Sequence, residues 1–217
     1  WGDSYASMDL PVKIEKPIFG ENENLNFARF IIPAMSIFVV FLSSSAFTSL
    51  SIVGHRKEGL IERTLVTGAT TDEIIFSHVI SHSLASVVQI AIMMLVTYFL
   101  FNMQWKGSFW LITGLIYAQS AVGMAWGLFL SAVSNNETEV IVLELGVTIP
   151  MLFFCGILWP LEALPKLIYV LNHFAPITYS TIAVRDMWLK GWEFDLNSVT
   201  FAYLSSLVWF AIFVISA

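Results

Sequence analysis

Five long apolar stretches, nearly free of charge, constrain this chain more than any other feature. A helix needs about 20 mostly apolar residues to cross a hydrocarbon core of about 30 Å, and residues 30–53, 74–101, 109–133, 140–161 and 199–217 meet or approach that length. Backbone groups in lipid must be paired within the segment, so each stretch is predicted to be a helix unless the segments close a barrel. The stretches are continuous and do not alternate, which excludes a barrel. We therefore predict an all-α, polytopic membrane protein.

The composition agrees with a protein whose main solvent is lipid. Charged residues make up 12% of the chain, whereas soluble domains carry roughly 25%. The net charge of −6 argues against a nucleic-acid partner, because phosphate binding needs clustered Lys and Arg. Cys155 is the only cysteine, so no disulfide can form within the chain. Because the chain opens with Trp1 rather than Met, begins with polar residues and stops within an apolar run, we expect it to be part of a longer polypeptide.

The segments between the apolar stretches differ in character. Residues 1–28 are polar and rich in Asn, and we interpret them as the end of an extracellular, water-exposed loop. Residues 54–73 carry a dense cluster of charges, whereas residues 162–198 are longer and only partly polar. Within the latter, the apolar piece from Leu164 to Ile177 is too short to span a membrane. It is predicted to be a re-entrant or interfacial segment.

Basic and aromatic residues bear on orientation. Cytoplasmic loops carry an excess of Lys and Arg; the segment 54–73 holds three basic residues close together, although the opposite side holds more of them, spread over longer loops. By density, 54–73 is predicted to be cytoplasmic and 162–198 external. Tryptophans on the side opposite 54–73 fit an aromatic belt at the membrane interface: Trp105, Trp110, Trp159, Trp188 and Trp192.

Motifs for ATP binding are missing from this sequence. No Gly is followed by Lys, so the chain contains no G-x-x-x-x-G-K-[ST] loop to hold phosphates. No His-Glu-x-x-His pattern and no cysteine pair occurs either. If ATP drives this protein, ATP and Mg bind to an ATPase outside these residues, and the chain itself needs no cofactor or metal.

The charged segment contains two helix signals. Arg56 to Leu65 are predicted to form a short amphipathic helix with Leu60 and Ile61 on its apolar face. A second helix is predicted to begin at Thr70-Thr71-Asp72-Glu73, where Thr or Asp can cap the helix and acidic side chains suit its positive end. The segment is either a solvated loop with ordinary ion pairs or a rigid lever on the membrane surface that a soluble partner can push.

The run from Glu58 to Ala69, followed by a span, resembles the E-x-G-x-x-E-x-L-x-x-[TS]-[PG] region of type-2 ABC permeases. In that family this region includes the coupling helix that docks on the nucleotide-binding domain. The resemblance therefore implies coupling to an ATPase by six residues: Arg56, Glu58, Gly59, Glu62, Arg63 and Gly68.

A second match lies far along the chain. The family's pattern has a Gly near the end of a span, a Pro, a Leu-Pro pair, then Pro-x-Thr and an Arg. Here it is matched by Gly156, Pro160, Leu164-Pro165, Pro176-Ile177-Thr178 and Arg185. The resemblance implies an external gate at Gly156, Pro160 and Pro165. Cys155 departs from the pattern, because many relatives have Ser before the Gly.

The resemblance covers residues 30–217, which would hold five of an expected six spans, with the missing span before Trp1. It is to the drug or lipid exporter type, similar to the G subfamily and to related arthropod transporters. It implies a nucleotide-binding domain on the same or a separate polypeptide, a homo- or heterodimer of permease domains, and a place in the plasma membrane.

Three ionisable residues inside the predicted spans are candidates for an inner gate. Glu144 lies about one turn inside its span, where it either snorkels toward the turn at 134–139 or makes a polar contact in the bundle, such as with His78 or His82. We predict that Glu144 helps to hold the cytoplasmic gate. His78 and His82 share a helix face at a spacing that can bind a metal. Polar packing is the favoured interpretation, because no Cys or close carboxylate completes a site.

Small residues and one proline indicate packing and bending. Gly123 and Gly127 form a G-x-x-x-G pattern that permits close helix approach. The run Ser43-Ser44-Ser45 indicates tight packing or a polar strip along a pathway. Pro150 predicts a kink that would suit a movable outer gate. Asn136-Glu137-Thr138 matches a glycosylation sequon, which we interpret as a chance match on the cytoplasmic side.

The favoured function is ATP-driven export by alternating access, in which the 54–73 segments close the inner gate while the outer gate opens. One alternative is an ATP-independent secondary transporter or channel, which would favour inverted repeats or broken helices with buried charges. Another is an intramembrane enzyme, for which His78, His82 and Glu144 are the only catalytic candidates and lack a nucleophile. A hydrophobic or amphipathic substrate suits the Phe-rich spans, which do not identify it.

Overall fold

A computed structural model of the chain describes residues 27–103, 105–194 and 197–217, and every regular element in these residues is helical. Two short turns, η1 (Leu161–Ala163, a 3-10 turn) and η2 (Asp186–Lys190, a π-helical turn), accompany eight α-helices. The helices are α1 (Phe27–Lys57), α2 (Leu60–Val66), α3 (Thr71–Phe99), α4 (Phe109–Val133), α5 (Glu137–Phe154), α6 (Lys166–Asn172), α7 (Thr178–Arg185) and α8 (Asn197–Ser216). The predicted external loop, 1–28, lies almost wholly outside the described residues.

Four of these helices, α1, α3, α4 and α8, are long and apolar enough to cross a membrane. They correspond to the predicted stretches 30–53, 74–101, 109–133 and 199–217. The fifth stretch, 140–161, forms the shorter helix α5, which ends at Phe154 because Gly156 adopts a left-handed conformation with φ of 78°. Crossing of the membrane by α5 therefore stays a prediction.

Helix α4 is the centre of the bundle, and it contacts α1, α3, α5, α7 and α8. Half or more of the apolar spans of α1 and α4 is buried, compared with 17% of α3 and 22% of α8. The polypeptide itself therefore covers α1 and α4, whereas α3 and α8 present most of their apolar surface outward. In a membrane protein such surface is suited to lipid.

The G-x-x-x-G pattern lies at the closest approach of α1 and α4. A Cβ added at Gly123 would lie 2.5 Å from the carbonyl oxygen of Phe41, and one at Gly127 would lie 2.5 Å from that of Ser45. Any side chain at either position would therefore push the two backbones apart. The predicted close approach of helices at these glycines is confirmed.

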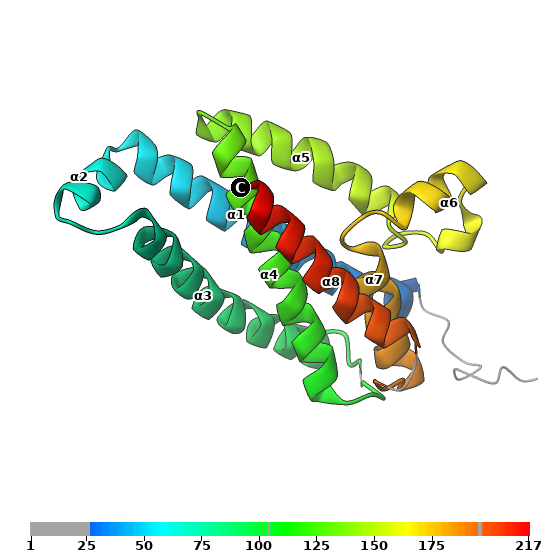
Figure 1. Cartoon of the computed structure of the whole chain (residues 1–217). Helices are drawn as coiled ribbons and strands as arrows, with labels where there is room; N and C mark the ends of the chain where they lie inside the picture. The colour runs from blue at the N-terminus through cyan, green and yellow to red at the C-terminus, as the bar shows by residue number, and fades with distance from the viewer. Residues whose placement is uncertain (1–26, 104, 195–196) are drawn as a thin grey trace, which may run out of the picture.

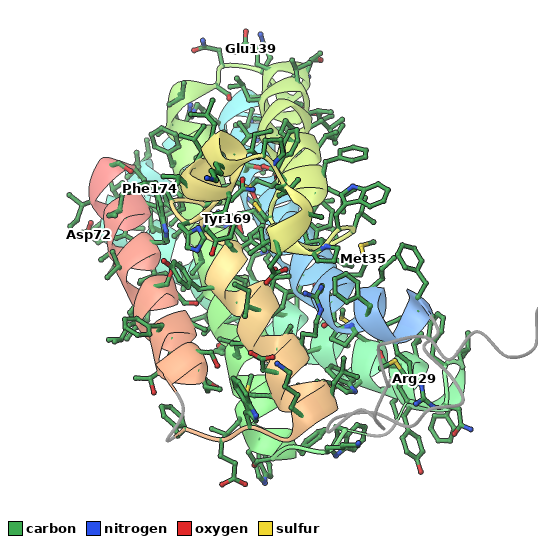
Figure 2. The ribbon with its side chains drawn as sticks, turned by 90° about the vertical axis from the view of Figure 1, so that its right-hand side faces the viewer. Arg29, Met35, Asp72, Glu139, Tyr169 and Phe174 are labelled. Carbon is green, nitrogen blue, oxygen red and sulfur yellow. The ribbon has the colours of Figure 1, made fainter. Side chains whose placement is uncertain are left out.

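The two ends of the bundle carry different elements. Figure 1 shows α2 projecting at one end and α6 and α7 at the other; we call these the α2 end and the α6 end. Figure 2 views the molecule from the side of α6, with Tyr169 and Phe174 in front of the long helices.

One member of the expected aromatic belt does not fit: Trp188 is 1% exposed and belongs to the hydrophobic core, whereas Trp110 is 79% exposed.

Candidate functional site

A glycine lies at each end of helix α2, and both adopt a backbone conformation that favours glycine. Gly59 precedes it with φ of 67°, and Gly68 follows it with φ of 94°. Residues with a Cβ disfavour this left-handed region, so glycine lets the chain turn sharply into and out of α2. None of the seven residues of α2, all of them described by the structure, is buried, and Val66 is 88% exposed. The short helix therefore projects an uncovered surface, on which Glu62 and Arg63 are also exposed.

The predicted start of this helix at Arg56 is wrong. Arg56 and Lys57 form the last turn of α1, because Gly59 breaks the helix before α2 begins at Leu60. Their side chains reach the turn between α4 and α5: Arg56 Nη1 donates to the carbonyl of Ser134 at 3.4 Å, and Lys57 Nζ pairs with Glu137 at 3.4 Å. Of the six residues assigned to coupling, Arg56 thus also connects α1 to a neighbouring loop.

Two caps order the backbone around this surface. Thr70 Oγ1 accepts from the backbone N–H of Glu73, and the Glu73 carboxylate accepts from the N–H of Thr70, which confirms the predicted helix start. At the start of α5, Glu139 accepts from the backbone N–H of Asn135 at 2.8 Å and from the side-chain amide of Asn136. These donors lower the pKa of Glu139 below the ordinary glutamate value, so its carboxylate is charged at neutral pH.

Glu144 is buried between α1, α4 and α5. It is 3% exposed, and its Oε2 accepts from Ser45 Oγ at 2.7 Å, while Oε1 is buried without a partner among the described residues. Trp126 of α4 also keeps a buried indole N–H without a hydrogen bond there. Glu144 therefore does not snorkel toward the loop, and the alternative prediction of a polar contact inside the bundle is confirmed. The suggested contact with His78 or His82 is wrong, because the partner is Ser45.

The two histidines lie in a row with a third. His55 Nδ1 of α1 is 3.3 Å from His78 Nε2 of α3, and the rings of His78 and His82 stack at 6.0 Å. The described residues contain no group of three His, Cys, Asp or Glu side chains arranged to hold a metal ion. The arrangement joins α1 to α3 near the α2 end.

Hydroxyl and amide side chains connect the middle of the bundle. Ser44, Ser86 and Ser120 form a buried cluster between α1, α3 and α4, with Ser44 and Ser120 2.8 Å apart and Ser120 donating to Ser86 at 2.7 Å. All three serines of the predicted run make polar contacts between helices, since Ser43 accepts from the side-chain amide of Gln89 and Ser45 donates to Glu144. Sequence reasoning did not single out Gln119, whose side chain accepts from Ser180 and Ser206 and so joins α4, α7 and α8.

The predicted external gate residues lie together at the α6 end. Gly156 ends α5, Pro160 precedes η1, and Pro165 precedes α6. A Cβ at Gly156 would lie 2.9 Å from Leu161 Cγ, so glycine also permits a tight fold-back at this point. Asn172 of α6 donates to the carbonyl of Phe154, which satisfies a backbone acceptor at the end of α5.

Arg185 connects α7 to α1 and to the end of α5 at the α6 end. Its Nη2 donates to the carbonyl of Gly156 at 2.8 Å, its Nε donates to the carbonyl of Phe30 at 3.2 Å, and its guanidinium lies 3.6 Å from the centre of the Phe30 ring. Burial lowers the pKa of Arg185 to about 10, so it is still charged at neutral pH. Arg185 is part of the second motif match, but sequence reasoning predicted no role for it. The signal that could have identified it was a charged residue within a weakly polar segment.

Comparison with known families and proteins bears on what these sites do. The ABC-2 type transporter family matches residues 15–189, about four fifths of the chain. ABC transporter G family member 20 of Dictyostelium discoideum is 35% identical over 206 residues, 94% of this chain and 28% of that protein. ABC transporter G family member 23 of the same organism is 29% identical over 82% of this chain and 25% of that protein.

A bacterial relative has the same kind of name. The probable multidrug ABC transporter permease YbhR of Escherichia coli is 24% identical over 177 residues, 81% of this chain and 48% of that protein. The chain thus spans less than half of the length of each of these three relatives. No solved structure matches it.

Proposed function

The chain belongs to the ABC-2 type transporter family, and from that premise we propose that it is the membrane part of an ATP-driven exporter. Membership makes it a transmembrane transport domain of the permease type and not itself the ATPase. It also disfavours an ATP-independent carrier and an intramembrane enzyme. Export by alternating access, a plasma-membrane location, a dimer of permease domains and a partner ATPase that binds ATP and Mg are parts of the proposal.

The uncovered surface of α2 is the observation that supports coupling to an ATPase. Leu60, Leu65 and Val66 are exposed on a helix that projects from the end of the bundle (Figure 1). Exposed apolar residues beside charged ones are typical of a protein interface. The turns at Gly59 and Gly68 and the capped start of α3 connect α2 directly to α1 and α3. A displacement of α2 by a bound ATPase would therefore be transmitted to both helices.

The inner gate is proposed at Glu144 and the outer gate around Gly156. Ser45 and Glu144 join α1 to α5, and Arg185 joins α7 to the end of α5 and to α1. Alternating access requires contacts at one end to open while contacts at the other end close. Helices α1 and α5 take part in the contacts at both ends. A rotation of α5 relative to α1 would therefore open the contacts at one gate while it closes those at the other. Glu144→Gln is expected to change ATPase stimulation by transported compounds.

The substrate is proposed to be hydrophobic or amphipathic. A relative named as a probable multidrug permease supports a drug-like substrate class, which we extend to this chain. Its spans are mainly apolar, and most of their buried polar side chains are hydroxyls. A sterol, lipid or drug-like compound therefore suits them better than a strongly charged solute.

Substitution of the α2 surface tests the proposal. Val66→Asp in the full-length protein, reconstituted with its ATPase in proteoliposomes, should leave the fold intact because Val66 is 88% exposed, but should lower ATP hydrolysis and transport. Phe174→Asp at the α6 end, where Phe174 is 72% exposed, is the matched control and should retain both. Equal activity of the two variants would remove α2 as the coupling surface.

A further inference from the structure

An apolar groove runs between α3 and α4 and opens on the outer side of the bundle. Its volume is ≈ 830 Å³, within the roughly 300–1,000 Å³ of sites that bind small molecules. Residues from α3, from α4 and from the segment between them line it; among them are Ala91, Leu95, Tyr98, Trp105, Thr113 and Tyr117. A second hollow on α3, lined by Ser83 and Leu84, continues it from the shared residue Val87 toward the α2 end.

Helix α3 is covered less by the bundle than α1 and α4 are, because only 17% of its span is buried. Its polar contacts with the other helices lie at His78, Ser83, Ser86 and Gln89, toward the α2 end. The lining includes two small residues, Ala91 of α3 and Gly114 of α4. A Cβ at Gly114 would already meet the Tyr203 hydroxyl at 2.9 Å.

The length of the groove corresponds to one leaflet. On α3 it extends from Val87 to Phe99, which is about 18 Å at 1.5 Å per residue. On α4 it extends from Phe109 to Tyr117, which is about 12 Å by the same rise. One half of a hydrocarbon core of about 30 Å is about 15 Å. A single acyl chain that enters from the surface at the α6 end would therefore lie in it lengthwise.

The mouth of the groove suits the polar part of a phospholipid. Tyr98, Trp105 and Trp110 line that end, and such aromatic residues concentrate at the headgroup level of membranes. Aromatic side chains at this end would therefore lie beside the glycerol and headgroup of a phospholipid whose acyl chain occupies the groove.

A positive charge is placed beside the mouth. Lys106 follows Trp105, and the backbone N–H of Lys106 is fixed to the carbonyl of Trp188 at 3.1 Å, so the position of the loop is determined. The Lys106 side chain is exposed and makes no salt bridge within the described residues, whereas Lys190 nearby is paired with Asp186 at 2.7 Å. Lys106 is thus the basic group at this rim that is open to an anionic phosphate.

From this combination we propose that the α3–α4 groove binds one anionic phospholipid from the leaflet at the α6 end, with an acyl chain along α3 and α4 and the phosphate near Lys106. The site differs from the gates at Glu144 and Gly156, and it does not depend on the direction of transport. A lipid held here would fill a space that α3 and α4 leave open and would fix the angle between them.

Native mass spectrometry of the full-length protein tests the site. Phosphatidylglycerol and phosphatidylcholine with identical acyl chains serve as probes, and one phosphatidylglycerol per chain should survive mild activation. Ala91→Trp, which fills the groove, should weaken retention about tenfold or more, equivalent to ~1.4 kcal/mol. Ile92→Trp, on the same helix but outside the lining, should retain the lipid. Lys106→Gln should remove the preference for phosphatidylglycerol.

A second measurement does not depend on the folding of any variant. Phosphatidylglycerol with a photoreactive group on its acyl chain should label wild-type residues 87–99 and 109–117. Labelling confined to other helices, or equal retention of both lipids by wild type and Ala91→Trp, would overturn the proposal. If instead Leu95→Cys forms a disulfide with a second copy in the membrane, the groove is an interface between chains and the lipid assignment is wrong.

Discussion

At the scale of single residues, Ser45 and Glu144 make the polar contact that places an ionisable group inside the bundle. The Ser45 hydroxyl donates to a carboxyl group that has no other hydrogen-bond partner among the described residues. Removing the partner of a buried polar group costs about 1–3 kcal/mol, because the remaining group is left without compensation. The two residues therefore stabilise each other, and α1 and α5 with them.

Ser45→Ala is expected to destabilise the protein by about 1–3 kcal/mol. Ser49→Ala is the matched control: Ser49 is also buried on α1, one turn away, but its hydroxyl bonds only to carbonyls of its own helix. The measurement is the apparent Tm of the full-length protein in detergent. Equal shifts for the two variants would show that the contact with Glu144 contributes nothing to stability.

Gly123 is required by the distance between α1 and α4. Gly123→Ala places a methyl group 2.5 Å from the Phe41 carbonyl oxygen, so the helices must separate, and we expect a loss of about 1–3 kcal/mol from overpacking. Gly146→Ala on α5, where a Cβ would have no neighbour within 4 Å, should be neutral or slightly stabilising. Thermal unfolding of both variants measures the difference, and a tolerated Gly123→Ala would contradict the close approach.

At the scale of elements, the conformation of the chain around α2 depends on its two glycines. Gly59→Ala should cost roughly 1–2 kcal/mol, because a Cβ is disfavoured at φ of 67° even though nothing lies within 4 Å of it. Gly54→Ala, inside α1 and equally free of neighbours, is the control and should not destabilise. Hydrogen exchange across residues 56–70 would report whether α2 frays in the first variant alone.

The α6 end depends on Arg185 in the same way. Arg185→Ala leaves the carbonyls of Phe30 and Gly156 without their donor, and we expect a loss of about 1.5–3 kcal/mol, as for hydrogen bonds to charged groups. Lys190→Ala removes a partly exposed pair with Asp186 and should cost less than about 1 kcal/mol. Faster proteolysis between 156 and 165 in Arg185→Ala, but not in Lys190→Ala, is the expected result.

At the scale of the whole molecule, orientation in the membrane is the property on which the proposed coupling depends. In a full-length protein without other reactive cysteines, Phe174→Cys should react with an impermeant thiol reagent on intact cells, and Val66→Cys only after permeabilisation. Both positions are well exposed, and Cys155 is buried. A glycan on Asn136, or external proteolysis near Arg63, would place α2 outside and exclude its contact with a cytoplasmic ATPase.

The helical class, the bounds of the four candidate spans to within four residues, the capped start of α3 and the family motif could all be predicted from the amino-acid sequence. Each follows from local rules: hydropathy and length set a span, and Thr70 with Glu73 sets a cap. The end of α5 was missed by seven residues, because apolar composition continues past Phe154 while the backbone turns at Gly156. Composition does not report that turn.

Which side chains meet depends on how the helices pack. Ser45 and Glu144 are 99 residues apart in the chain, and Arg185 lies 155 residues from Phe30, so no spacing rule could pair them. The same holds for the α3–α4 groove, because the apolar sequences of two helices do not show how closely the helices pack. Local sequence specifies what an element is, whereas packing of the elements decides which of its polar groups are enclosed and which surfaces remain open.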